Sequence, residues 1–403
     1  MEHSIMRIDE CCVSVSDGDH LPPPKSEIGV PFITISNINP IKNSIDFSDA
    51  MYVPREYYES VSNIRKAVPG DILYSVVGSF GIPVLIKEDK EFVFQRHIAI
   101  LRPDHEVVIP EFLYYIMRSN SFFAQADAYA IGSAQRTLSL GSLRKMKVVI
   151  PSLRVQEKIV SILSAYDNLI EVNNKRIKVL EQMAENLYKE WFVRFRFPGH
   201  ENAEFENGIP KEWNVCRFSS IANVLSGGTP STEHDEYYGG KIPFYTPKDS
   251  MDDYFVFDTI SSLTEEGLQH CNSQLYPKNA IMITARGTVG NLNLLARPMA
   301  MNQSCYALTS DTIPSQYFLF FLIKREILKL KKMASGGVFD TIIVNTFDHI
   351  KVSVPKESLI QEFDKLVSPI MDETYTLLEH NRNLIKQRDL LLPRLMSGKL
   401  VVQ

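Results

Sequence analysis

Polar side chains that could make paired hydrogen bonds gather beside glycine turns in both halves of this sequence. They include Arg, Gln, Asn, Ser and Thr, the types that read base edges in duplex DNA, where Arg pairs with guanine and Asn or Gln with adenine. We take them as candidate DNA-binding residues, with an ordinary solvated loop as the open alternative for each. They are Ser79, Gln95, Arg96, His97, Gln135, Arg136, Thr137, Arg286, Thr288, Asn302, Gln303, Ser304 and Thr341.

Within this set the residue types suggest different tasks. Arg96 and Arg286 flank corresponding parts of the two halves and suit the O6 and N7 atoms of guanine best. Thr137 and Thr341 are identical in both halves, which favours a framework or phosphate contact over sequence choice. The turns at residues 78–81 and 287–290 could cradle a phosphate, but a tight strand-to-strand turn that needs positive φ is the favoured interpretation.

No motif of a catalytic centre accompanies these residues. The sequence contains no Asn-Pro-Pro-Tyr or Asp-Pro-Pro-Tyr motif of an amino-methyltransferase and no Phe-x-Gly-x-Gly cofactor loop. The stretch 397–400 lacks the upstream glycine and the Ser or Thr of a phosphate-binding loop. Five cysteines form no Cys-x-x-Cys pair, so a zinc site is not expected. We predict a chain that is not an enzyme and has no catalytic residue, metal or cofactor of its own.

An internal repeat positions the candidate residues. Residues 132–151 align with 336–355 without a gap, and a Gly, a Thr, a Lys-Val pair and the closing Pro are identical. Residues 30–34 match 242–246, residues 78–81 match 287–290, and Gln95 matches Gln303. Because the matches keep the same order, the chain is predicted to be a duplication. Short β-branched and aromatic runs between Gly, Pro and Asn residues predict an α+β fold with a mixed sheet in each copy.

A long helix is predicted after each copy. Apolar residues recur at heptad spacing from Ile159 to Trp191 and again from Phe363 to Leu391, with Pro393 expected to end the second helix. Each seam contains one Asn, Asn173 or Asn381, a residue that typically fixes helix register. Pairing the helices antiparallel would place two related domains at the ends of a rod of roughly 57 Å, related by a pseudo-two-fold axis.

Composition narrows the functional class. A net charge of −5 disfavours a protein that coats nucleic acid without sequence preference, but not a sequence reader that borrows a phosphate-binding surface from a partner. No apolar run approaches membrane-spanning length, and the N-terminus lacks a signal-peptide pattern. Together with the cysteine pattern, this predicts a cytoplasmic protein without membrane contact.

Three stretches resemble the specificity subunit of type I restriction–modification systems. Residues 169–198 are similar to that family's central conserved region, residues 209–213 (Ile-Pro-Lys-Glu-Trp) to the start of its second recognition domain, and residues 388–400 to its C-terminal ending. The first domain has no matching Pro-x-x-Trp. The predicted organisation is a first target recognition domain (1–151), a central helix (152–193), a linker (194–209), a second target recognition domain (210–355) and a C-terminal helix (356–403).

The resemblance implies the function and the partners. Each recognition domain would read one half of a bipartite, asymmetric site in double-stranded DNA, and the helices would dock two modification (methyltransferase) subunits. Restriction subunits would join that core. S-adenosylmethionine, ATP and Mg²⁺ are expected on these partner subunits and not on this chain. The alternative is a coiled-coil scaffold or adaptor that does not bind DNA, which should carry matching loops in its two domains. A stand-alone methyltransferase would need the missing cofactor motifs.

Overall fold

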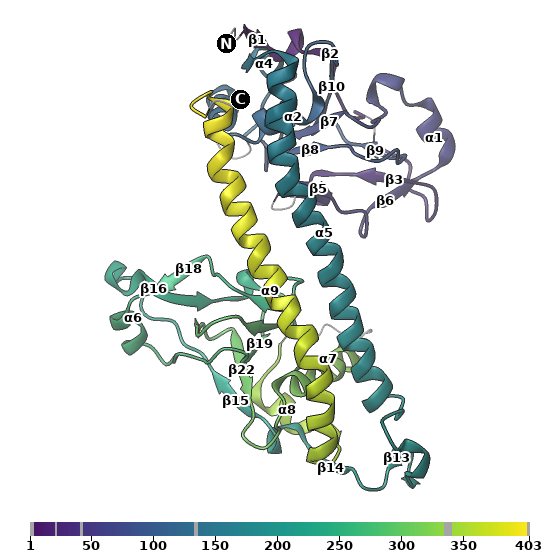
Figure 1. The fold of residues 1–403 in the computed structure, drawn as a ribbon, viewed down its shortest axis with the longest axis vertical. Coiled ribbons are helices and arrows are strands. Elements are labelled where there is room, and N and C mark those ends of the chain that lie inside the picture. The colour runs from purple at the N-terminus through teal and green to yellow at the C-terminus, as the bar shows by residue number, and fades with distance from the viewer. Residues whose placement is uncertain (1–3, 21, 41–42, 133–135, 334–340, 401–403) are drawn as a thin grey trace. The chain divides into compact units, whose positions relative to one another are not determined.

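The computed structural model describes residues 4–20, 22–40, 43–132, 136–333 and 341–400. They form two compact units, Met1–Leu169 with Leu384–Gln403, and Ile170–Asn383 (Figure 1). Each unit contains one α+β domain and a portion of each of two long helices, α5 (Leu153–Phe192) and α9 (Glu357–Met396). The predicted α+β fold with two repeated domains is therefore confirmed.

The first domain is built on two small sheets. A four-stranded antiparallel sheet has the order β2-β10-β7-β8, and a three-stranded sheet has the order β6-β3-β9, in which β3 and β9 are parallel. The strands of these sheets are β2 (Cys12–Asp17), β3 (Val30–Ile33), β6 (Met51–Val53), β7 (Ile72–Ser75), β8 (Pro83–Leu85), β9 (Val93–Phe94) and β10 (Ile98–Pro103). Two-stranded ribbons join β1 (Ser4–Arg7) to β11 (Lys147–Ile150) and β4 (Ile38–Asn39) to β5 (Ser44–Ile45). The helices are α1 (Arg55–Ser60), α2 (Pro110–Met117), α3 (Asn120–Tyr129) and α4 (Leu140–Lys145).

The second domain repeats this plan. Its larger sheet has the order β15-β22-β19-β20-β17, its smaller sheet the order β18-β16-β21, and β14 pairs with β23. The strands are β14 (Asn214–Arg217), β15 (Asn223–Ser226), β16 (Tyr238–Tyr245), β17 (Phe255–Val256), β18 (Ser261–Leu263), β19 (Ile281–Thr284), β20 (Leu292–Leu295), β21 (Ala300–Met301), β22 (Cys305–Thr309) and β23 (Lys351–Val354). The helices are α6 (Glu265–Gln269), α7 (Gln316–Met333) and α8 (Val344–His349), and a short hairpin of β12 (Phe205–Glu206) and β13 (Ile209–Pro210) precedes the domain.

The inner strands β7 and β19 of the larger sheets carry apolar residues on both faces because both faces are covered. All four residues of β7 and of β19 are fully buried. Successive side chains of a strand point to opposite faces. Accordingly, Ile72 and Tyr74 pack in one apolar cluster and Leu73 in another, and Ile281 and Met282 of β19 divide in the same way. This two-sided burial explains the uninterrupted apolar runs in the sequence.

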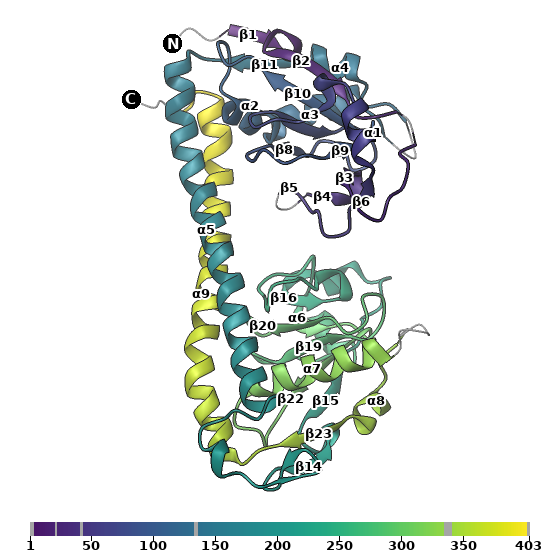
Figure 2. The ribbon, with the colours of Figure 1, turned by 90° about the vertical axis from the view of Figure 1, so that its right-hand side faces the viewer.

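The two long helices pair antiparallel in each unit, as predicted. In the second unit Asn173 Nδ2 donates to Asn381 Oδ1 at 2.8 Å, and Arg176 forms an ion pair with Glu373. In the first unit Asp167 is bound to Arg388. Figure 2 shows α5 and α9 side by side within each unit. Both helices contain 40 residues and begin at Leu153 and Glu357, so equivalent positions differ by 204 in number.

Some details of the predicted seam are wrong. Tyr188, Met371, Leu378 and Leu392 are buried, whereas the predicted seam residues next to them in the sequence are only half-buried: Leu187, Ile370, Leu377 and Leu391. The domains cover additional faces of the helices, and this burial widens the apolar stripe beyond a two-helix seam. Pro393 does not end α9, which continues to Met396 and is followed by Gly398 with a left-handed φ of +68°.

Candidate nucleic-acid interface

The glycine turns are tight connections between neighbouring strands. In the first domain Gly81 N–H donates to Ser75 O at 2.9 Å, and in the second Gly290 N–H donates to Thr284 O at 2.8 Å. Gly78, Gly81, Gly287 and Gly290 all have φ between +70° and +92°, a range that L side chains rarely adopt. A Cβ added to Gly81 would lie 2.6 Å from the Phe123 ring. The favoured interpretation, a strand-to-strand turn that requires glycine, is confirmed.

Three separate segments meet at the same edge of each larger sheet. In the first domain Val76 N–H donates to His97 O at 2.9 Å, and Leu138 N–H donates to Val76 O at 2.8 Å. In the second domain Ala285 N–H donates to Ser304 O at 2.8 Å, and Ile342 N–H donates to Ala285 O at 3.0 Å. The glycine turn, the segment before β10 or β22, and the segment before α4 or α8 are therefore neighbours in both domains. The candidate residues named from the sequence lie on these three segments, except that Gln135 is outside the described residues.

Backbone hydrogen bonds define which candidates are equivalent. Gln95 N–H donates to Ile33 O, and Asn302 N–H donates to Tyr245 O, each at 3.0 Å. The strands that supply these carbonyls, β3 and β16, pair in the same register with β9 and β21. Gln95 is thus equivalent to Asn302, and the predicted match of Gln95 with Gln303 is wrong by one residue. That match followed residue identity, whereas the register follows the hydrogen bonds.

With the corrected register, equivalent backbone positions of the two domains carry different side chains. Arg96 is equivalent to Gln303, and both side chains are exposed. Arg286, which is also exposed, occupies the position of Val77, directly before the glycine turn. Arg96 and Arg286 therefore lie at the same sheet edge in their domains but on adjacent segments, not at equivalent positions. Neither guanidinium has a hydrogen-bond or ion-pair partner among the residues that the structure describes.

Several other candidates have structural tasks. Arg136 is paired with Asp127, and its guanidinium lies 5.7 Å from the centroid of the Phe80 ring. Asn302 Oδ1 accepts from Ser304 N–H at 3.0 Å, which stabilises the turn before β22. Thr137 exchanges two backbone hydrogen bonds with Ile131, each of 2.9 Å. The side chains of Arg136 and Asn302 are therefore less available as base readers, whereas the Thr137 bonds involve only its main chain.

The remaining candidates keep polar groups at the surface. Ser79, Thr288 and Thr341 are exposed, while Gln95 and His97 are half-buried. The carbonyl of Thr288 accepts from the Thr284 hydroxyl within the turn, which leaves the Thr288 hydroxyl outside that bond.

The loops after β2 and β15 bring residues to this sheet edge that are not among the candidates predicted from the sequence. Gln303 Oε1 accepts from the Thr229 hydroxyl in the second domain. In the first domain Asp17 pairs with His20 at 2.7 Å and lies 3.4 Å from the Arg65 guanidinium. The divergence of these two loops was visible in the sequence and is the signal that could have identified them. Each loop starts at a glycine, Gly18 or Gly227, where a Cβ would overlap a backbone carbonyl at 2.2–2.3 Å.

A half-buried tyrosine holds the loop after β2 in place. Tyr57 donates to Asp19 Oδ2. Burial and the neighbouring Asp19 carboxylate raise the pKa of the Tyr57 phenol above its ordinary value of 10.0, so the hydroxyl keeps the proton that it donates. The described residues contain no group of three or more side chains that could hold a metal ion, and none of their helices is long and apolar enough to cross a membrane.

The same sheet edge, with unlike side chains on like backbones, thus occurs in two copies in this chain. The family model of the type I restriction modification DNA specificity domain matches residues 18–182 and again residues 210–387. The HindI type I restriction enzyme specificity subunit of Haemophilus influenzae is 25% identical in an alignment of 405 residues, and the alignment covers 83% of this chain and 88% of that protein. The MjaIX specificity subunit of Methanocaldococcus jannaschii is 26% identical over 304 residues, with 73% and 70% covered.

A solved structure has the same fold. The S subunit of a type I restriction–modification system from M. genitalium superposes with a TM-score of 0.58 at 17% identity, over 98% of this chain and 96% of that one. Because the family model matches both repeats, this chain belongs to the type I restriction–modification DNA specificity family. The resemblance stated from the sequence is thus confirmed.

Proposed function

We propose that this chain reads a bipartite, asymmetric site in double-stranded DNA, with one half-site for each recognition domain. The observation that carries the proposal is that equivalent backbone positions carry different side chains: the exposed Arg96 against the exposed Gln303, and the half-buried Val77 against the exposed Arg286. A duplicated fold that served only as a scaffold would have no reason to vary these positions. Divergent side chains on a repeated frame are what two different half-sites require.

The residue types suggest what each domain recognises. An exposed arginine can pair with guanine O6 and N7, and a glutamine can pair with adenine N6 and N7. Arg96 and Arg286 would therefore contact guanine, and Gln303 would contact adenine. Thr229, which donates to Gln303 Oε1, would hold the glutamine amide in place for this contact. Ser79, Thr288 and Thr341 fit single contacts to phosphates.

The long helices offer a surface for the modification subunits. Val172, Val179 and Met183 of α5 are 59%, 56% and 50% exposed. With 3.6 residues per turn, these three side chains fall on one face of the helix, beside the buried seam. Exposed apolar stripes of this kind mark sites of protein association. We therefore assign this face to helices of two modification subunits, with restriction subunits joining the assembled core.

The chemistry would belong to these partners. S-adenosylmethionine, ATP and Mg²⁺ are assigned to the modification and restriction subunits, and this chain would have no catalytic role. Such an assembly acts on DNA and therefore belongs in the cytoplasm. The scaffold alternative differs in one measurable way, because it requires no specific DNA contact from this chain.

The test is a selection from random duplexes with the complex of this chain and its modification subunits. We expect enrichment of two unlike half-sites separated by a constant spacer. Replacing residues 1–151 with the domain of a relative should change one half-site only. Methyl transfer by the purified chain alone, a symmetric site, or the same enrichment with modification subunits that lack this chain would contradict the proposal.

A further inference from the structure

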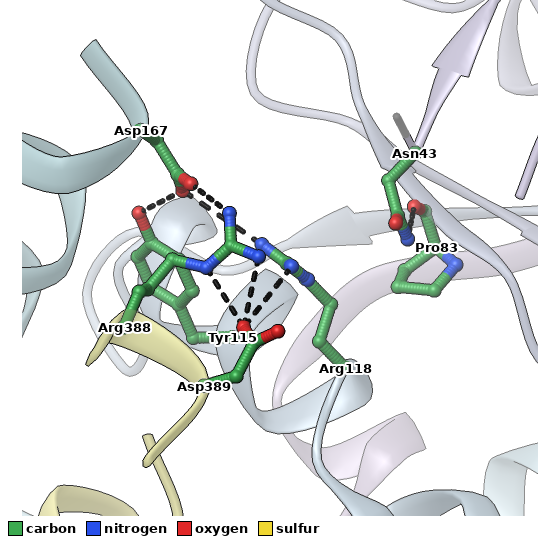
Figure 3. A network of polar contacts seen from close by, with 7 residues as sticks. All are labelled: Asn43, Pro83, Tyr115, Arg118, Asp167, Arg388 and Asp389. Carbon is green, nitrogen blue, oxygen red and sulfur yellow. Dashed lines mark hydrogen bonds and ion pairs between the residues drawn. The ribbon is translucent and has the colours of Figure 1, made fainter. Parts of the chain in front are cut away.

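A partly buried polar junction joins the first recognition domain to both long helices (Figure 3). The Tyr115 hydroxyl of α2 donates to Asp167 Oδ2 of α5 at 2.6 Å, and Arg388 of α9 contacts Asp167 Oδ1 at 2.5 Å. Arg388 is only 8% exposed and also binds Asp389 Oδ1. Arg118, at the end of α2, lies 3.8 Å from both aspartates. Three elements thus share one carboxylate, that of Asp167.

One contact of this junction, between Arg118 and Asp389, has a counterpart in the second unit. Arg118 and Lys324 are both the ninth residue counted from the start of their helices, at Pro110 in α2 and Gln316 in α7. Asp389 and Glu185 are equivalent in the long helices, which are offset by 204 positions. Lys324 Nζ lies 2.8 Å from Glu185 Oε2. Each domain is therefore attached by a basic residue to the end of one long helix.

The contacts among Tyr115, Asp167 and Arg388 have no counterpart in the second unit. At the positions equivalent to Tyr115, Asp167 and Arg388, the second unit has Phe321, Met371 and Ala184, all in its apolar core. Phe321 is 2% exposed, and the other two are fully buried. The same place in the fold is thus filled by three apolar side chains in one domain and by a hydrogen-bonded, charged triad in the other.

Ion pairs of this kind bring little net stability compared with well-packed apolar side chains, but their hydrogen bonds are directional and favour one geometry. If α5 and α9 shifted by one turn, about 5.4 Å, Asp167 and Arg388 would lose contact with each other. If α2 rotated on the helices, the Tyr115 hydroxyl would lose its acceptor. Apolar contacts are not directional and would permit such changes at lower cost.

We propose that Tyr115, Asp167 and Arg388 are positioning residues that hold the first recognition domain in one orientation on the helix pair. By this means they set how sharply the complex distinguishes spacer lengths between the two half-sites. This inference rests on the proposed reading of a bipartite site. The three residues touch no DNA in this scheme; they act by restricting where the domain can present its reading edge.

The experiment measures the affinity of the complex with modification subunits for duplexes with the preferred spacer and with spacers one base pair longer or shorter. Tyr115→Phe removes one hydrogen bond, and Asp167→Asn removes the negative charge that Arg388 and Arg118 face, both with little change in volume. In both variants the ratio of affinities between the preferred and altered spacers should fall about threefold to tenfold, which corresponds to the net contribution of one ordinary hydrogen bond. Affinity for the preferred spacer should change less than the ratio does.

Arg176→Ala is the matched control, because the Arg176–Glu373 pair also joins α5 to α9 but involves neither recognition domain. It should leave the ratio unchanged. If Asp167→Asn does not fold, the triple variant Tyr115→Phe, Asp167→Met, Arg388→Ala installs the apolar set of the second unit, and it too should lower the ratio. An equal loss of affinity for all spacers, or an unchanged ratio, would overturn the inference. If the unaltered complex bound no DNA sequence specifically, the proposed function would be refuted, and the inference with it.

Discussion

The paired asparagines of the long helices provide a quantitative test of how the helix seam is specified. Asn173 and Asn381 are each 5% exposed and are joined by a hydrogen bond of 2.8 Å, and Asn381 Nδ2 donates to Asn174 Oδ1 at 2.8 Å. The equivalent position in the other helix holds Leu377 for Asn173 and Ile177 for Asn381. The perturbations are therefore Asn173→Leu and Asn381→Ile, which the repeated seam already accommodates.

Each single substitution leaves one buried amide group without its partner. A buried unsatisfied polar group costs about 1–3 kcal/mol, and the newly buried apolar atoms offset part of that loss. We expect each single variant to lose about 1 kcal/mol of unfolding free energy. The double variant removes both orphaned groups and should be at least as stable as the original chain. It should therefore be about 2 kcal/mol or more above the sum of the two single effects.

Denaturant unfolding followed by tryptophan fluorescence measures this quantity. Trp191 and Trp213 are the only tryptophans and are both buried in the core of the second unit, which also contains the asparagine pair. The exposed Arg176–Glu373 pair of the same helices is the control cycle, with an expected coupling of about 0.2–1 kcal/mol. Additive effects of the two asparagine substitutions, within about 0.5 kcal/mol, would refute the argument that the amides act as a pair.

The remaining predictions concern DNA reading, spacing and pH. Arg96→Ala should weaken binding by about 1–3 kcal/mol and relax specificity in one half-site only, and Arg286→Ala should do so in the other; uniform loss across a panel of single-base variants would indicate phosphate contacts. Four residues inserted in both helices, beside Asn173 and Asn381, add about 6 Å of helix and should lengthen the preferred spacer by roughly two base pairs, with unchanged half-sites; an unchanged spacer would contradict this. Burial raises the pKa of Glu181 from 4.5 to about 7, so this carboxyl reduces stability as the pH rises through that interval. Glu181→Gln should therefore unfold like the original chain near pH 4 but be more stable by about 2 kcal/mol near pH 8, and equal stability at both would refute the burial argument.

Glu185 affects the pH dependence of stability with the opposite sign to Glu181, so the two contributions can be separated. Burial opposes its ionisation, but hydrogen bonds from Lys189 and Lys324 lower the pKa of Glu185 to about 2. Its contribution to stability is therefore present above pH 4.5 and is lost as the pH falls toward 2. This loss occurs in the original chain and in Glu181→Gln alike, so the difference between the two reports on Glu181.

Periodicity and repetition in the sequence were sufficient to predict the architecture. The order of the repeated segments predicted two domains of one fold, and heptad spacing predicted two long helices that pair antiparallel. These features are local or are copied within the chain, so they can be read without knowing which distant residues touch. Periodicity misplaced individual buried residues by one position, as at Leu187 beside the buried Tyr188, where the domain covers an additional face of α5.

The roles of individual polar residues depended on the tertiary structure. Sequence alone suggested Arg96, Arg136 and Arg286 as similar donors, but only folding pairs Arg136 with Asp127 and leaves the other two guanidinium groups exposed. The correct partner of Arg96 in the repeat, Gln303, followed from backbone hydrogen bonds. The physical reason is that a hydrogen bond between side chains requires both groups within about 3 Å, and spacing along the chain cannot determine that proximity for residues joined only through the packed domain.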